Sequence, residues 1–185
     1  MKKAIFIVAI LFVAVISTAC INNIAVQELN NAAEVSMSKG DFDGAIEKLE
    51  ASLDLDCNVY QTYYNLGVAY IESRQFSKAI SALEKSIKLN SKYPESYYSL
   101  AIAQEAFADE FSDTKSENSN NLSIGIVNSS SEGLSVSDRD TMINNYNLAI
   151  SNYNKYISLC SSDIKKEEIS AHIKDIENVL KKLEY

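Results

Sequence analysis

The chain has 185 residues, 46% of them apolar, and carries a formal net charge of −8 with a pI of about 4.7. Without its apolar N-terminal run, this length is enough for a single domain with a modest core. One Pro and five Gly favour long helices over a many-turned β-sandwich, and the acidic balance, with no basic block beyond the first three residues, argues against nucleic acid as a partner.

The first twenty residues are typical of an export signal. Lys2 and Lys3 form a charged start, and residues 4–16 are an almost unbroken apolar run. This run is shorter than the roughly 20 residues that cross a bilayer, but it suits the core of a signal peptide. We therefore interpret residues 1–19 as a signal peptide and expect the protein to be exported.

The signal ends at a cysteine. Cys20 follows Ala19, and a small residue before Cys after an apolar run resembles a bacterial lipoprotein signal. The resemblance implies a lipid on Cys20, a tether over residues 20–25, and a membrane-anchored lipoprotein on the periplasmic or cell-surface face. Ile21 after the cysteine, in place of Asp, is compatible with sorting to an outer membrane. Ser17 stands where lipoprotein signals prefer Leu, so a soluble secreted protein and an uncleaved anchor remain alternatives.

Two apolar stripes follow each other in the middle of the chain. The first consists of Tyr63, Leu66, Gly67 and Tyr70, and the second of Phe76, Ala79, Leu83, Ser86 and Leu89. Each has the three-to-four-residue spacing of an amphipathic helix, with a turn at Arg74–Gln75, so the sequence predicts a helical hairpin. Because Gly67 has no side chain, we expect it to let the two helices approach closely against Ala79 and Ser86.

This pattern resembles the tetratricopeptide repeat, which has a period of 34 residues. The resemblance is carried over 60–93 by Leu66–Gly67, Tyr70 and Ala79 in their expected places, although Ser91 replaces the family's Pro. One period earlier lies a first repeat at 26–59. The resemblance implies an all-α fold, a short solenoid of about three helical hairpins. Together with the N-terminal signal, the chain resembles bacterial lipoproteins that contain these repeats.

The third repeat is interrupted. It begins at Pro94 and continues with Ala101 in the small-residue position, but Leu100 and Ala149 lie 49 residues apart where one repeat earlier the interval is 13. About 36 residues are therefore inserted, at about 107–142, and the repeat is expected to span 94–160.

The insertion is rich in Ser and Asn at its centre. We predict two lengthened helices around a disordered tip at about 113–136. Ser137 is predicted to cap the second of these helices.

Residues 161–185 predict a last helix with one apolar stripe, made of Ile169, Ile173, Ile176, Leu180 and Leu183. Repeat stacks need a terminal helix with a polar outer face, so we interpret this one as a cap on a monomer. Its heptad-like spacing leaves a coiled-coil dimer as the alternative. Cys57 and Cys160 lie two repeats apart, too far for a disulfide, and we expect two free thiols packed as small apolar residues.

The sequence offers no catalytic constellation. His172 is the only histidine, which excludes sites that need two, and we expect it on the surface. Metalloprotease and phosphate-loop motifs are absent, and the carboxylates alternate with lysines as on solvated helix faces. We therefore predict a protein that is not an enzyme and that has no cofactor and no metal site.

The resemblance implies that the first helix of each repeat lines a groove for a peptide or a partner helix. In this sequence the groove residues are Asn31, Gln61, Tyr64, Asn65, Val68, Ile71, Tyr98 and Ile102. Tyr64 and Tyr98 are the expected anchors, with packing against neighbouring helices as the alternative. Some relatives grip a C-terminal carboxylate with Lys and Arg, but here Asn31 and Asn65 have no such cations beside them, so a neutral or basic apolar segment suits the groove.

These observations lead to two hypotheses. The first is a membrane-tethered adaptor of the bacterial envelope that binds a segment of another envelope protein in its groove. The alternative is a periplasmic accessory protein that binds a small apolar ligand or assists a solute transporter.

Overall fold

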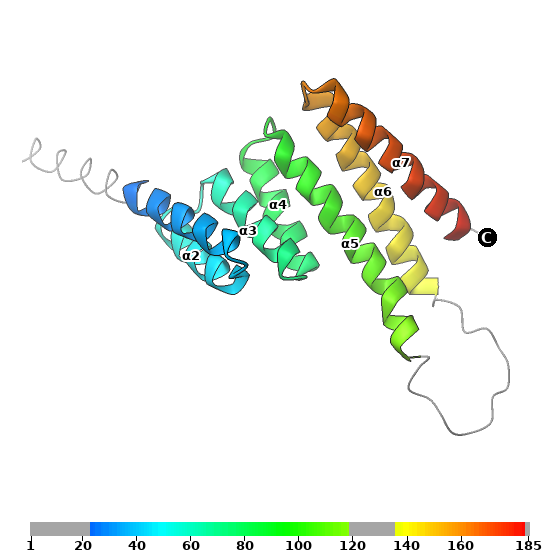
Figure 1. The fold of residues 1–185 in the computed structure, drawn as a ribbon, viewed down its shortest axis with the longest axis horizontal. Coiled ribbons are helices and arrows are strands. Elements are labelled where there is room, and N and C mark those ends of the chain that lie inside the picture. The colour runs from blue at the N-terminus through cyan, green and yellow to red at the C-terminus, as the bar shows by residue number, and fades with distance from the viewer. Residues whose placement is uncertain (1–22, 119–135, 184–185) are drawn as a thin grey trace, which may run out of the picture.

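A computed structural model of the chain describes residues 23–118 and 136–183. These residues form helices and the short turns between them (Figure 1). After a first helix over 23–38 come α2 (Phe42–Leu55), α3 (Tyr60–Glu72), α4 (Phe76–Leu89), α5 (Pro94–Asn118), α6 (Val136–Leu159) and α7 (Asp163–Leu183). The prediction of an all-α stack of helical hairpins with a terminal helix is confirmed. The predicted signal peptide and Cys20 lie outside the described residues, and no helix among the described residues is long and apolar enough to cross a membrane.

The helices stack in chain order, and alternate helices also meet. Each helix from α2 to α7 packs on its neighbour, and α3 in addition contacts α5. The first helix reaches α3 through a hydrogen bond from Asn30 to Thr62, and α5 reaches α7 through a contact between Glu105 and His172. The first helix, α3, α5 and α7 therefore form one wall of the stack, and α2, α4 and α6 form the other (Figure 1).

The turns inside the first two hairpins share one backbone conformation. Gly40 has φ +76°, and Arg74, one 34-residue period later, has φ +58°. After Gly40, the carboxylate of Asp41 accepts a hydrogen bond from the backbone N–H of Gly44 at 3.0 Å and caps α2. Left-handed backbone is unfavourable for a residue with a side chain. At Arg74 this conformation is accompanied by a cation–π contact, in which the guanidinium lies 5.6 Å from the centre of the Phe76 ring.

Gly67 of α3 lies against Leu83 of α4, a member of the first core cluster, which also contains Leu49, Leu66 and Ala79. A Cβ atom added to Gly67 would lie 2.4 Å from Cγ of Leu83, a residue with no exposed surface. The close approach was predicted, but its partner is Leu83 and not Ala79 or Ser86. Ser86 instead donates to the backbone oxygen of Tyr60 at 2.9 Å and shares a hydrogen bond with Ser96 at 2.8 Å.

The boundaries of the predicted insertion and tether need correction. α5 continues through Asn118, so 113–118 are helical and not part of a disordered tip; residues 119–135 lie outside the described part. α6 begins at Val136, which places Ser137 inside its first turn and not at its cap. Residues 23–25, predicted as tether, already belong to the first helix.

The stripe of α7 is buried against α6 in the same chain. Ile169, Ile173, Ile176 and Leu180 join Met142, Tyr146, Ala149 and Tyr153 in the second core cluster. These side chains are therefore used inside the chain, which favours the terminal cap over the coiled-coil seam. Cys57 and Cys160 are free, as predicted. Cys57 is exposed, however, so its predicted packing is wrong, because it lies in the turn between α2 and α3.

Candidate binding groove

The wall formed by the first helix, α3, α5 and α7 carries two depressions. One, of about 390 Å³, lies between the first helix and α3. The other, of about 360 Å³, lies between α5 and α7 with Tyr153 of α6 at its base. We call this wall with its two depressions the groove. The end at the first helix and α3 is the amide end, and the end at α5 and α7 is the tyrosine end.

Side-chain amides dominate the amide end. Its lining consists of Asn23, Val26, Gln27, Asn30, Asn31, Glu34, Val59, Gln61 and Asn65. Three predicted groove residues are therefore brought together here: Asn31 and Gln61 are exposed, and Asn65 donates to Glu34 at 3.5 Å. Amides both donate and accept hydrogen bonds, so this end suits a polar, uncharged ligand surface such as a peptide backbone.

Asn30 fixes the floor of the amide end. Its Nδ2 atom, which carries two hydrogens, lies within hydrogen-bond distance of three acceptors: the side-chain oxygens of Ser52 and Thr62, each at 2.9 Å, and the backbone oxygen of Val26 at 2.8 Å. Ser52 and Thr62 are fully buried. The amide thus ties three helices together, which holds the lining residues in place.

The middle of the groove is packed more tightly than predicted. Tyr64 is half-buried, with its ring 5.2 Å from that of Tyr93 at an interplanar angle of 89°. Burial raises the pKa of Tyr64, a hydrogen bond with Ser99 opposes this in part, and the charge of Glu95 adds to the increase. Val68 and Ile71 are half-buried as well, and Ile71 packs against the core of the first two hairpins. Of the two alternatives for Tyr64, the geometry corresponds to packing on a neighbouring segment.

The tyrosine end combines aromatic rings with carboxylates. Tyr98 is 39% exposed, and its ring lies 5.9 Å from that of Tyr153 and 5.2 Å from that of Tyr156. Ile102, Glu105, Glu168, Ile169 and His172 complete the lining together with Tyr98 and Tyr153. The predicted residues Tyr98 and Ile102 therefore share one depression, and Tyr98 keeps the exposed face that an anchor needs.

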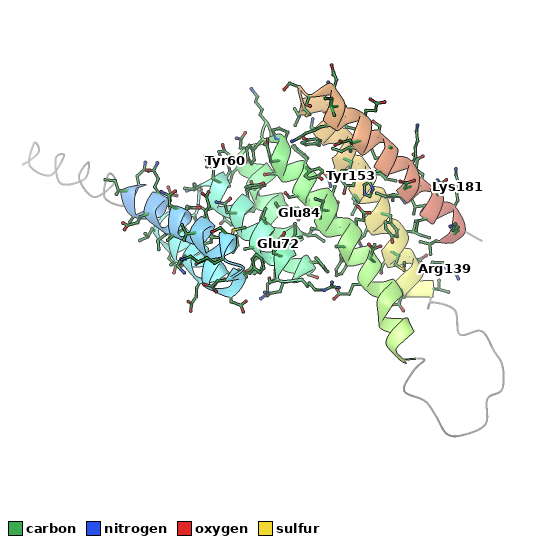
Figure 2. All side chains as sticks on the ribbon, viewed as in Figure 1. Tyr60, Glu72, Glu84, Arg139, Tyr153 and Lys181 are labelled. Atoms are coloured by element: carbon green, nitrogen blue, oxygen red, sulfur yellow. The ribbon has the colours of Figure 1, made fainter. Side chains whose placement is uncertain are left out.

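Glu105 is held at the tyrosine end by two donors. The Tyr153 hydroxyl and the His172 ring nitrogen Nε2 both lie 2.9 Å from its Oε2 atom. Tyr153 lies between α5 and α7 (Figure 2), and burial, followed by the charge of Glu105, raises its pKa. Tyr153 therefore stays protonated and donates across the ordinary pH range.

His172 and Glu168 are groove residues that the sequence analysis missed. His172 is exposed, as predicted, but it faces Glu105 and Tyr153 instead of open solvent. Applying the 34-residue period once more, with the insertion of about 36 residues added, takes Tyr98 to Glu168 and Ile102 to His172. Extending the register past the insertion would have found both.

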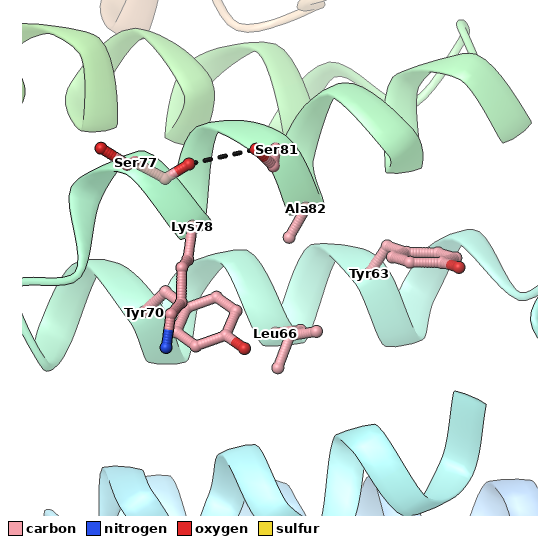
Figure 3. A pocket seen from close by; sticks show the side chains of 7 residues that line it. All are labelled: Tyr63, Leu66, Tyr70, Ser77, Lys78, Ser81 and Ala82. Carbon is pink, nitrogen blue, oxygen red and sulfur yellow. Dashed lines mark hydrogen bonds between the residues drawn. The ribbon is translucent and has the colours of Figure 1, made fainter. Parts of the chain in front are cut away.

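A third hollow is lined by side chains of α3 and α4 (Figure 3). Its lining includes Tyr63, Leu66 and Tyr70, and its volume is about 470 Å³. Lys78 lies 5.4 Å from the centre of the Tyr70 ring, and the Tyr70 hydroxyl donates to Glu50 at 2.9 Å. Burial and Glu50 together raise the pKa of Tyr70 to about 12. The Tyr70 hydroxyl and the Lys78 ammonium group are thus already engaged in contacts within the chain.

Titratable side chains elsewhere are dispersed. Across residues 23–110 and 136–183, no group of three or more His, Cys, Asp or Glu side chains is arranged to hold a metal ion.

Comparison with known proteins supports the repeat pattern. A tetratricopeptide-repeat family model matches residues 60–93. The sequence has no match among curated proteins.

Solved structures share the fold at low sequence identity. The first tetratricopeptide-repeat domain of human RPAP3 is 16% identical, with a TM-score of 0.61, and the match covers 86% of this chain and 94% of that domain. The second domain of human RPAP3, solved with the HSP70 peptide SGPTIEEVD, is 12% identical with a TM-score of 0.58 and coverages of 83% and 98%. The type III secretion chaperone SycD of Yersinia enterocolitica, solved with a peptide of the translocator YopD, is 14% identical with a TM-score of 0.54 and coverages of 86% and 94%.

The matched repeat is the α3–α4 hairpin, which lies between the hairpin of the first helix with α2 and the longer hairpin of α5 with α6. Residues 60–93 are therefore a tetratricopeptide repeat, and the chain folds as a tetratricopeptide-type helical solenoid.

Proposed function

We propose that this protein is an interaction module that binds an extended segment of another protein along its groove. The observation that carries the proposal is the lining of the amide end, where exposed Asn31 and Gln61 stand beside Asn65. Their amides match the alternating N–H and C=O groups of a peptide main chain. In the solved structures of similar fold, the second RPAP3 domain and SycD were each captured with a peptide.

A peptide segment suits the groove better than a small apolar ligand. Small-molecule sites are mostly apolar and enclose most of their ligand. The two depressions here stand at opposite ends of a helical wall and are lined by amides, carboxylates and exposed side chains. A segment of several residues reaches from one end toward the other, whereas a metabolite would occupy one end and leave the other unused.

The charge of the groove selects the type of segment. Glu34 lines the amide end and Glu105 and Glu168 line the tyrosine end, and no Lys or Arg belongs to the described lining of either. An acidic tail such as the SGPTIEEVD peptide bound by RPAP3 would meet like charge here. We therefore assign the groove to a neutral or basic segment.

Site-specific crosslinking tests the proposal. A photoreactive amino acid at Gln61, or at Tyr98, should crosslink one partner protein in the native cells, and fragmentation should place both crosslinks within one short segment of it. The same label at Glu84, exposed on α4 in the opposite wall (Figure 2), is the matched control and should not capture that partner. Equal capture from Gln61 and Glu84 would remove the groove from the interaction.

We also propose that the module is exported and tethered to a membrane of the bacterial envelope through a lipid on Cys20, which makes its partner another envelope protein. The support is the charged and apolar start of the chain and the small residues before Cys20. The described part of the first helix starts at residue 23. Three residues of chain reach about 10 Å at most, so the amide end would lie close to the lipid surface, where membrane-bound partners are.

Replacing Cys20 by Ser tests the tether. The wild-type chain should incorporate a labelled fatty acid and sediment with membranes, and Cys20→Ser should lose the label. Cys57→Ser is the control, because Cys57 is a free, exposed thiol within the folded region and its replacement should leave labelling unchanged. Undiminished labelling of Cys20→Ser would show that this residue does not carry the lipid.

A further inference from the structure

The tyrosine end of the groove places an aromatic face beside carboxylates. Tyr98 is 39% exposed and lines the depression together with Glu105 and Glu168. Its ring packs against those of Tyr153 and Tyr156 at centroid distances of 5.9 and 5.2 Å. An aromatic face attracts a cation within about 6 Å of the ring centre, and nearby carboxylates strengthen that attraction.

Glu105 is already oriented for such a cation. Its side chain is 21% exposed, and its two hydrogen bonds, from Tyr153 and His172, both end on Oε2. Neither bond uses Oε1, so that atom keeps its capacity to accept a hydrogen bond from a further donor. A carboxylate fixed in advance loses little conformational freedom when it binds a donor, which favours affinity.

The charge balance of the depression is negative. Glu105 and Glu168 are its anionic lining residues, and His172 is the one lining side chain there that can carry a positive charge. Even with His172 protonated, two carboxylates face one cation. An apolar side chain placed here would take water from carboxylates without replacing their hydrogen bonds, which is costly.

We infer that the tyrosine end is a subsite for the cationic side chain, Lys or Arg, of the bound partner segment, which would lie on the Tyr98 ring with its charge toward Glu105 and Glu168. The inference rests on the proposed function and specifies the segment: a basic residue at this end, with main chain along the amides at the other. The charge complementarity of the lining is what selects this occupant.

Selection from a random peptide library displayed on phage, with the full chain immobilised in mild detergent, tests the subsite. Wild type should enrich peptides with Lys or Arg at one position. The double variant Glu105→Gln with Glu168→Gln should lose that preference while still selecting peptides. Glu84→Gln, on an exposed glutamate of the opposite wall, is the control and should keep the preference.

A second measurement uses one enriched peptide. Replacing its basic residue by norleucine, which keeps the length but removes the charge, should weaken binding about tenfold, as expected for a cation–π contact supported by carboxylates. Tyr98→Phe should keep the affinity because the ring remains, and Tyr98→Leu should reduce it as norleucine does. Circular dichroism of both variants shows whether they are folded.

The outcomes separate the subsite from the function. Peptides enriched without any basic preference would overturn the subsite and leave the groove as a peptide site. Failure to enrich any peptide, joined by an absence of crosslinks from Gln61, would overturn both. Displacement of the peptide by tetramethylammonium alone at an equal concentration would point to a free small cation as the ligand, which also overturns the inference.

Discussion

Replacing Gly67 by Ala should lower the free energy of unfolding by about 1–3 kcal/mol. In an exposed helix the same change would be favourable by about 1 kcal/mol, because Ala has the higher helix propensity. Here the new Cβ would lie 2.4 Å from Cγ and 2.8 Å from Cδ2 of Leu83. Leu83 has no exposed surface into which to move, so α3 and α4 must separate. Denaturant titration followed by circular dichroism measures the change.

A double-mutant cycle with Leu83 shows whether this contact is the cause. Leu83→Ala alone should cost about 2–5 kcal/mol, because it leaves a cavity in the core. In the Leu83→Ala background the branched side chain is gone, so adding Gly67→Ala should cost little or become favourable. The two single effects should therefore exceed the double by at least about 1 kcal/mol. Simple additivity would mean that the tight crossing lies elsewhere.

The helical spacing predicted most of the residues that face the core, although Tyr63 and Leu89 of the predicted stripes are only half-buried. Leu66, Tyr70, Ala79 and Leu83 are all buried, as the stripes indicated. The period does not say which of these side chains touch, because a helix can rotate by part of a turn and keep the same stripe inward. The partner of Gly67 depends on that rotation, and for this reason Leu83 was missed in favour of Ala79 and Ser86.

Equivalent repeat positions also differ in their neighbours. Tyr64 and Tyr98 lie one period apart and were predicted alike as anchors. Tyr64 lies against Tyr93, whereas Tyr98 lies against Tyr156, which occupies the place that Ser86 holds one repeat earlier. The side chains that lie against each ring are thus set by contacts between helices, and not by the spacing along one of them.

To predict the tyrosine end from the sequence, a further step was needed, because its residues come from both sides of the insertion. Glu105 of α5 and His172 of α7 are 67 residues apart in sequence. A pattern within one repeat cannot bring them together. The length of the insertion had to be combined with the assumption that α7 continues the row of first helices. From the sequence, α7 was interpreted as a terminal cap or a dimer seam, and not as a groove helix.

Replacing Ile176 by Ala should destabilise the chain by about 2–5 kcal/mol. Ile176 is 3% exposed and packs in the core cluster shared by α5, α6 and α7. For a domain of this size, such a loss lowers the melting temperature by several degrees, at about 2–4 °C per kcal/mol. Val179→Ala is the matched control on the same helix: Val179 is 38% exposed, and the expected change is within about 0.5 kcal/mol.

The same pair of variants separates a terminal cap from a dimer seam. If α7 packs on α6 of its own chain, the melting temperature of the wild type should not depend on protein concentration, and Ile176→Ala should lower it equally at every concentration. A stripe shared between two chains would couple folding to association, so the melting temperature would rise with concentration. Because burying the α7 stripe also brings His172 within 2.9 Å of Glu105, loss of α7 packing should remove the basic-residue preference of the tyrosine end along with the stability.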